Sequence, residues 1–162
     1  MAAGGEARTE GGMSAEITEI KNRFTGAVIF SAKVEGATAG IRLGACVRLA
    51  LAARANLADA DLAGANLANA DLANAYLAGA YLAGAEGILD CGTPYGWRVV
   101  VNVYGGAVRI CAGCRSFTFK EAMAHWKNRD DRKLMLPLLA YIEAAAKINK
   151  WPLAAKHERR TA

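Results

Sequence analysis

A five-residue period between Ala55 and Glu86 constrains the fold of this chain more than any other feature. Six consecutive units carry leucine at the third position and alanine two residues earlier. An α-helix turns about 140° over five residues, so these leucines would not line one helix face. On an extended segment, residues two apart face the same side. The period therefore predicts a solenoid that turns a corner every five residues, with a structural core of Leu57, Leu62, Leu67, Leu72, Leu77 and Leu82.

The repeat resembles the pentapeptide-repeat family, whose motif reads Ala-Asp/Asn-Leu-x-x. The resemblance implies a right-handed, four-sided β-helix with four units per coil. Six units fit the motif, and a seventh that starts at Ala85 fails because Gly87 replaces the central leucine. We therefore expect about one and a half coils. Members of the family mostly lack enzymatic activity and do unrelated jobs, so the resemblance implies a fold and not a reaction.

Stacked coils leave unpaired backbone and apolar interior at both ends, so a solenoid needs caps. The Gly105-Gly106 pair between two β-branched runs predicts a hairpin, and Thr118 with Glu121 forms a capping box at the start of a helix. The expected fold is mainly β with α caps. We expect a disordered leader at 1–13, a strand and capping helix at 14–54, the β-helix at 55–90, a hairpin with helices at 91–152 and a basic tail at 153–162.

Tyrosine stands at two outward positions of the repeat that are polar in the earlier units. Residues twenty apart stack in a four-sided coil, so Tyr76 lies over Asn56 and Tyr81 over Asp61. Exposed aromatic rings at such positions favour contact with another element or subunit over a ligand platform. We therefore expect Tyr76 and Tyr81 to form a partner or oligomer interface, with a homodimer favoured because the core of the repeat is small.

The second half of the chain resembles a module appended to pentapeptide repeats in phage and prophage proteins. The resemblance rests on two runs and on spaced helix residues. These are Trp97-Arg98-Val99-Val100, Gly113-Cys114-Arg115-Ser116-Phe117-Thr118, Glu121, Ala122, His125 and Trp126. It implies a phage setting and assigns no activity.

Charge is segregated along the chain. Residues 55–96 contain five acidic residues and no basic ones, whereas residues 97–162 contain 13 basic and five acidic residues. This asymmetry indicates either an anionic partner for the basic half or mutual neutralisation of the two halves. Guanidinium groups beside aromatic rings can hold phosphates and stack bases, so Arg98, Arg109 and Arg115 are candidates for binding an anionic ligand. The alternative is a solvated basic surface.

The remaining motifs do not indicate a reaction. Cys111 and Cys114 form a lone CxxC, and a zinc site would need Cys91 and His125 as well, so we expect buried thiols, no metal and no cofactor. The two histidines, His125 and His157, lack a nucleophile at motif spacing, and no glycine-rich phosphate loop is present. We therefore predict that the protein is not an enzyme.

Three functions remain as hypotheses. The first is a non-catalytic, phage-type interaction module that is oligomeric and binds a host or virion protein. The second is a binder of a nucleotide signal or nucleic acid through the basic half, counteracting host defence. The third, a DNA mimic that modulates a topoisomerase, is disfavoured because so few coils at about 4.8 Å each make a rod far shorter than a duplex footprint. Without an apolar signal or an 18-residue apolar run, we expect the cytoplasm of a bacterial host cell and no membrane contact.

Overall fold

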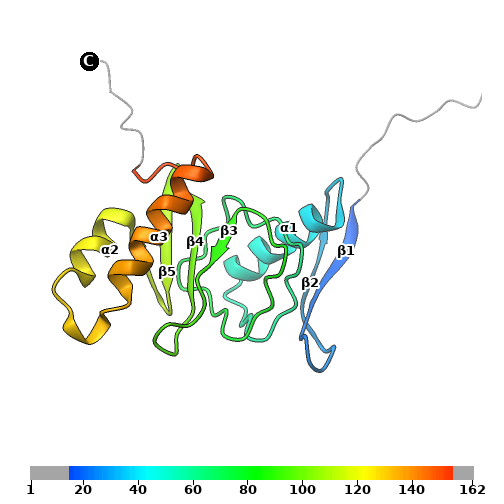
Figure 1. Cartoon of the computed structure of the whole chain (residues 1–162). Coiled ribbons are helices and arrows are strands. Elements are labelled where there is room, and N and C mark those ends of the chain that lie inside the picture. Colours follow the sequence, from blue (N-terminus) through cyan, green and yellow to red (C-terminus); the bar gives the residue numbers. More distant parts are fainter. Residues whose placement is uncertain (1–14, 155–162) are drawn as a thin grey trace, which may run out of the picture.

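The computed structural model describes residues 15–154, so the expected leader at 1–13, His157 and most of the expected basic tail lie outside the described residues. The described elements follow one another as layers (Figure 1). A hairpin and a helix come first, the repeat lies in the middle, and a four-stranded sheet with two helices completes the molecule. The expected single N-terminal strand is in fact a pair, in which β1 (Glu16–Lys21) runs antiparallel to β2 (Val28–Val34).

Helix α1 (Ala39–Ala52) covers the first coil of the repeat. It starts at Thr38, whose hydroxyl accepts a hydrogen bond from the Ile41 amide at 3.2 Å. Two glycines let it approach closely: a Cβ on Gly40 or Gly44 would overlap a carbonyl oxygen of the repeat. The Gly40 carbonyl accepts from the Asn66 amide at 2.9 Å, so the helix backbone itself is bonded to the repeat.

Each repeat unit is a tight turn whose geometry explains its fifth residue. The leucine carbonyl accepts from the amide three residues later, as in Leu62 to Ala65 at 3.1 Å. The residue before that amide has positive φ, which a type II turn requires at its third position and which glycine and asparagine tolerate. These residues are Asp59, Gly64, Asn69, Asn74, Gly79 and Gly84.

The second residue of the early units fixes the turn from the side. In the first four units its side-chain oxygen accepts a hydrogen bond from the amide two residues later, at 2.9 to 3.2 Å. Asparagine and aspartate can make this bond. The tyrosines of the last two units cannot make it, so Tyr76 and Tyr81 stand where the local turn bond is absent.

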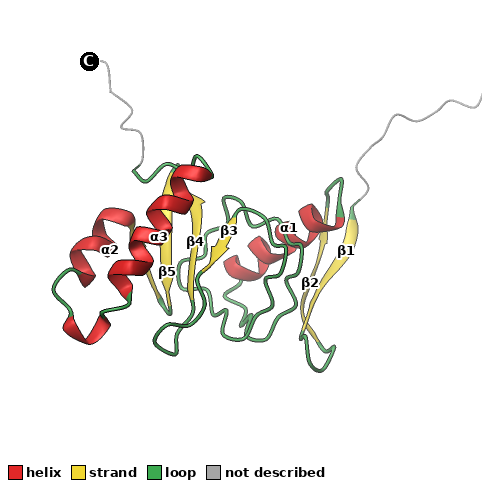
Figure 2. Ribbon diagram, in the orientation of Figure 1, coloured by secondary structure: helices red, strands yellow, loops and turns green. Residues whose placement is uncertain are grey.

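Backbone hydrogen bonds join successive coils with an offset near twenty residues. The Leu62 amide donates to the Tyr81 carbonyl at 2.9 Å, and the Tyr81 amide donates to the Ala60 carbonyl at 2.8 Å. The parallel pairing is limited to isolated bridges, Asp61 with Tyr81 and Asn66 with Glu86. Figure 2 accordingly draws the repeat mostly as loop. The described repeat therefore has no continuous solenoid sheet, because tight turns occupy most of each unit.

A four-stranded antiparallel sheet follows the repeat in the order β3 (Ile88–Asp90), β4 (Val99–Tyr104), β5 (Ala107–Ala112) and β6 (Arg115–Thr118). Its two faces contact different layers, because neighbouring strand residues point in opposite directions. Val100 and Cys111 pack on the leucine core of the repeat, whereas Val101 and Ile110 pack on the C-terminal helices. The sheet therefore closes the second end of the repeat.

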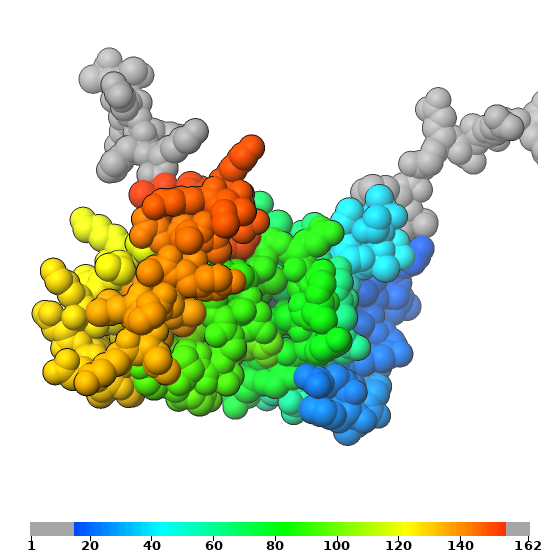
Figure 3. Space-filling model, in the orientation of Figure 1, coloured from blue at the N-terminus to red at the C-terminus, as the bar shows by residue number. Residues whose placement is uncertain are grey.

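The outer layer consists of α2 (Phe119–Trp126), the short 3₁₀ helix η1 (Asp130–Arg132) and α3 (Met135–Ile148). The expected capping box is present: the Glu121 carboxylate accepts from the Thr118 amide at 2.7 Å, and this bond holds the pKa of Glu121 below its usual value. In Figure 3 the repeat, in green, separates the blue N-terminal hairpin from the yellow and orange helices.

The fold is mixed α and β, where the sequence predicted a mainly β protein with α caps. Helix α1 and the four-stranded sheet flank a repeat built from turns and isolated bridges, and α2 and α3 cover the other face of the sheet. The six repeat leucines form the centre of one core, each with 8% or less of its surface exposed. Within residues 15–154, no helix is both long and apolar enough to cross a bilayer.

Candidate ligand-binding cleft

A cleft of about 400 Å³ opens between the end of the sheet and the outer helices, and we call it the Arg115 cleft. Its chemistry is basic and aromatic, and no carboxylate of residues 15–154 lines it. The lining residues are Trp97, Ala112, Gly113, Cys114, Arg115, Phe117, His125, Trp126, Arg129 and Arg132.

Local structure places each guanidinium at the rim. Arg115 is the first residue of β6 and pairs with Ala112, so its side chain lies on the sheet face that packs on the helices. Arg129 immediately precedes η1, and Arg132 ends it. The turn after α2 therefore brings two arginines that are distant in sequence from Arg115 to the same opening.

The electrostatics of the Arg115 cleft favour an anion. Within residues 15–154, neither Arg115 nor Arg129 forms a salt bridge, while Arg132 pairs with Asp131 at 3.0 Å. Desolvation lowers the pKa of His125, and the positive charges of Arg129 and Arg115 lower it further. His125 is therefore mainly neutral at pH 7, and the net charge of the cleft comes from the guanidinium groups.

Aromatic rings form one wall of the Arg115 cleft. Trp97 and Trp126 are stacked with their centroids 6.5 Å apart, and Phe117 meets Trp126 edge-on at 4.9 Å. The His125 ring lies 5.0 Å from that of Phe117. A wall of fixed rings beside guanidinium groups suits a ligand that has both a planar ring and a negative charge.

Arg98 has a structural position. Its guanidinium pairs with Asp90 at 2.6 Å and donates to the carbonyl oxygens of Leu77 and Ala80. It therefore joins the sheet to carbonyls at the end of the repeat. Asn102 does the same from β4, because its side-chain amide donates to the Ala70 carbonyl at 2.7 Å.

Arg109 also faces the repeat, since it pairs across the strands with Asn102. Its Nε and the Asn102 Oδ1 are buried without a hydrogen-bond partner in the described residues. The three arginines proposed from the sequence thus do not converge: Arg98 and Arg109 lie on one face of the sheet, and Arg115 lies on the other. Alternation along the strands separates them.

The cysteines lie in different environments. Cys111 is buried against the repeat, with its thiol 3.7 Å from the Ser116 hydroxyl, and burial raises its pKa. Burial together with Asp90 raises the pKa of Cys91 to about 12. Cys114 is exposed in the turn between β5 and β6. Among residues 15–154, no three His, Cys, Asp or Glu side chains gather as a metal site would require.

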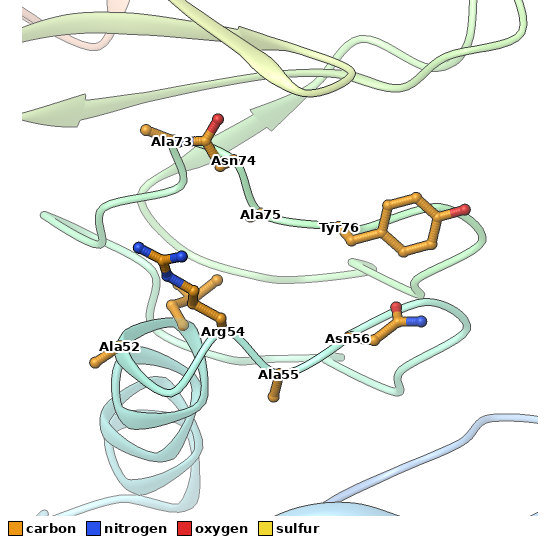
Figure 4. A pocket seen from close by; sticks show the side chains of 9 residues that line it. Ala52, Arg54, Ala55, Asn56, Ala73, Asn74, Ala75 and Tyr76 are labelled. Carbon is orange, nitrogen blue, oxygen red and sulfur yellow. The ribbon is translucent and has the colours of Figure 1, made fainter.

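The two tyrosines proposed as an interface are exposed in the monomer. Tyr76 has 60% of its surface accessible and Tyr81 has 44%. The Arg23 guanidinium lies 5.1 Å from the Tyr81 ring and 4.6 Å from the Phe24 ring. Tyr76 instead lines a cavity of about 620 Å³ at the end of α1, together with Arg54, Asn56 and Asn74 (Figure 4).

Sequence reasoning missed Arg129, Arg132 and Arg54. The first two belong to a run of mixed charges, Lys127 to Lys133, which has the composition of a solvated loop. Arg54 lies between the helix and the repeat, in a left-handed conformation with φ of 56°. The other lining residues did have a signal in the sequence. Seven of the residues that carry the resemblance to the phage-type module line the Arg115 cleft.

Residues 54–86 of the 162-residue chain match the family of pentapeptide repeats, counted as eight copies where the strict pattern gives six full units. No curated protein and no solved structure matches the chain. The match supports the repeat itself. The phage setting and the appended module remain predictions, as do the oligomer, the host partner, the cytoplasmic location and the absence of enzymatic activity.

Proposed function

We propose that the protein is a non-catalytic binding module that holds an anionic ligand with a planar ring, of the nucleotide class, in the Arg115 cleft. The observation that carries this proposal is the composition of the cleft: three arginines and stacked aromatic rings line it, and no carboxylate of the described chain does. A guanidinium presents planar, paired donors to phosphate oxygens, and the rings offer a surface for a base.

The location of the charge strengthens the argument. Two of the three arginines have no salt bridge within residues 15–154, so binding a phosphate would not require breaking an existing pair. A charge-assisted hydrogen bond contributes about 1.5–3 kcal/mol, so each of these arginines can change affinity by tenfold or more. A phosphate near His125 would also offset the two positive charges that lower the pKa of that histidine.

The test is calorimetric titration at low salt with adenosine monophosphate, adenosine and inorganic phosphate as separate probes. We expect adenosine monophosphate to bind more tightly than either adenosine or inorganic phosphate. The Arg115→Gln and Arg129→Gln variants should each weaken it about tenfold. Lys120→Gln is the matched control, because Lys120 is an exposed cation on α2 that does not line the cleft. Equal effects of all three variants, or no binding of any probe, would contradict the proposal.

The His125 resonances provide a second readout. Desolvation and the nearby arginines depress its pKa, and a bound phosphate, which offsets the positive charges, should raise that pKa. Proton NMR titration with and without nucleotide measures the change directly. An unshifted pKa at saturating nucleotide would place the ligand outside the Arg115 cleft.

A second candidate function, a contact surface for another protein or a second copy, is favoured by one observation. Phe24, which is 70% exposed, and Tyr81 flank the Arg23 guanidinium and give an accessible aromatic surface on the repeat side. We propose this surface as the oligomer interface. It includes Tyr81 but not Tyr76, whereas the sequence predicted that both tyrosines form the interface. Native mass spectrometry of the wild type and the Phe24→Ser/Tyr81→Ser variant tests it, and a wild-type monomer at micromolar concentration would rule out the oligomer.

We also propose that the repeat is a short segment of the right-handed, four-sided β-helix that its family motif implies. Turns every five residues and inter-coil hydrogen bonds offset by about twenty residues support this geometry. An experimental structure would test it by the path of the chain around the leucine core.

A further inference from the structure

The Arg115 cleft lies on the helix side of the sheet and adjoins a second cavity on the repeat side, at the end of the sheet. We call the row of three adjoining cavities the groove. A second cavity, of about 390 Å³, lies between the sheet and the last coil of the repeat and shares Trp97, Gly113 and Cys114 with the cleft. A third is the 620 Å³ cavity of Figure 4, which shares Asn74, Ala75 and Tyr76 with the second. Shared walls make the three cavities neighbours in a row, from the outer helices to the end of α1.

The charge of this groove is of one sign throughout. The charged side chains that line the three cavities, His125 aside, are Arg54, Arg98, Arg115, Arg129 and Arg132. Among the described residues, no aspartate or glutamate lines any of the three, although residues 55–96 carry five acidic residues and no basic ones. Arg98 is already held by Asp90, so the available positive charge lies at the two ends of the groove.

The groove also has aromatic surfaces at intervals. Trp97 lines the cleft and the second cavity, and the exposed Tyr76 ring lines the second and third. Tyr76 replaces the Asn or Asp of the earlier units and loses their turn hydrogen bond, so the local fold does not require a ring there. A separated series of rings is what stacking of successive bases needs.

At the third cavity, successive coils lack the backbone bridge that joins them elsewhere in the described repeat. Asp61 pairs with Tyr81 and Asn66 with Glu86, but no corresponding bridge joins Asn56 to Tyr76 in the described repeat. Figure 4 shows these two residues one above the other, with Arg54 extending from the end of α1 toward Ala73 and Asn74. Arg54 thus supplies a cation at the end of the groove opposite Arg115.

We propose that the ligand of this protein is a single-stranded oligonucleotide that lies along the whole groove, with its phosphates near the arginines and its bases against Trp97 and Tyr76. This inference rests on the proposed function, because it extends the nucleotide of the Arg115 cleft into a chain. Single-stranded binders combine a basic groove with aromatic platforms, and the paired bases of a duplex cannot stack on side chains in this way. Several phosphate contacts also make binding strongly dependent on salt.

The test is fluorescence anisotropy at low salt with 5′-labelled oligothymidylates of one, two, four and eight nucleotides. We expect affinity to rise at least tenfold from the mononucleotide to the longest chain, and to fall steeply with added salt. Tyr76→Ala and Arg54→Gln should weaken the eight-nucleotide ligand about fivefold or more, as loss of one stacked base or phosphate contact does, and leave the mononucleotide unchanged.

Two matched controls accompany these variants. Tyr141→Ala removes an exposed tyrosine on α3, and Lys33→Gln removes an exposed cation on β2. Within residues 15–154, neither residue lines any of the three cavities. Neither should change the affinity for any length. Circular dichroism of each variant checks that the fold is retained.

The outcomes separate the two proposals. Equal affinity at every length, unaffected by Tyr76→Ala but weakened by Arg115→Gln, would overturn the groove and leave the proposed function standing. No binding at any length would overturn both. Binding of an eight-base-pair duplex as tightly as the single strand would also overturn the inference. Slower alkylation of the Cys114 thiol on addition of the eight-nucleotide ligand would support it, because that thiol lies where the cleft meets the second cavity.

Discussion

Four cysteines in this chain illustrate how position decides the chemistry of one residue type. Cys46 and Cys111 are buried, and desolvation raises both pKa values. Cys91 is half-buried, and its pKa of about 12 keeps it as a thiol at neutral pH. Cys114 is exposed in a turn. Because the thiolate is the nucleophile and must be reached by the reagent, the exposed Cys114 is the best placed of the four to react.

We therefore expect one fast-reacting thiol in the native protein. With Ellman's reagent at pH 8, a single equivalent should react rapidly, and the other three should react only after urea is added. The Cys114→Ser variant should lose the fast phase completely, which serves as the assignment. A fast phase that survives in this variant would show that the burial of the other thiols is wrong.

Arg98 is a second case in which position overrides composition. The side chain that sequence reasoning placed in an anion site instead joins Asp90 to two carbonyls at the end of the repeat. Removing it leaves acceptors without a donor, and its side chain is only 15% exposed.

Arg98→Ala should lower the free energy of unfolding by about 2–3 kcal/mol. The loss should be smaller than for a fully buried ion pair, because water still reaches Asp90. Urea denaturation measures the change. Lys147→Ala is the control, because its pair with Glu143 is exposed and contributes at most about 1 kcal/mol. Equal losses in the two variants would contradict the structural role of Arg98.

At the scale of elements, the contact of α1 with the repeat depends on the absence of two side chains. Gly40 and Gly44 lie one helical turn apart, and each faces a repeat carbonyl that a Cβ would overlap. Helix propensity alone favours alanine over glycine by about 1 kcal/mol at an interior position. The two effects have opposite signs, so a single substitution separates them.

Gly44→Ala should destabilise the protein by about 1–3 kcal/mol, because the Asn66 carbonyl is backbone and cannot move without disturbing its coil. Thermal unfolding followed by circular dichroism is the measurement. A rise in the melting temperature, as propensity predicts, would mean that α1 does not pack against the repeat as described.

The elements show which parts of the fold were predictable. Leu57 and its five periodic partners could be assigned to a core because their period excludes a helix face, and Thr118 could be assigned as a cap from a local motif. Whether the repeat would form a continuous sheet could not be predicted. The answer depends on how much of each unit is a turn and how much pairs with the next coil, and the sequence period does not contain that geometry. The faces of Arg98 and Arg109 depend on which layer covers which side of the sheet, and no local pattern contains that information.

The same limit applies to the Arg115 cleft. Trp97, Arg115 and His125 were visible as residues of a spaced resemblance, but their convergence requires the β5–β6 turn and the packing of α2. Arg129 and Arg132 join them only because the chain turns back after α2. A mixed-charge loop carries no signal in sequence for which of its cations will face a cleft.

At the scale of the whole molecule, one sheet belongs to two cores. Its Val100 and Cys111 face the repeat leucines, and its Val101 and Ile110 face α2 and α3. The three tryptophans, Trp97, Trp126 and Trp151, all lie on the helix side. Tryptophan fluorescence therefore reports on one layer, whereas far-ultraviolet circular dichroism reports on all of them.

Because the sheet cannot keep either face buried alone, we expect the described layers to unfold together. Leu67→Ala, a change in the repeat core far from any tryptophan in sequence, should lower stability by about 2–5 kcal/mol. It should shift the fluorescence and circular dichroism midpoints in urea by the same amount. If the fluorescence midpoint stays at the wild-type value while the circular dichroism midpoint falls, the sheet and helices fold as a unit independent of the repeat. The groove would then join two bodies that can move apart. The increase of affinity with oligonucleotide length would then weaken as the repeat unfolds.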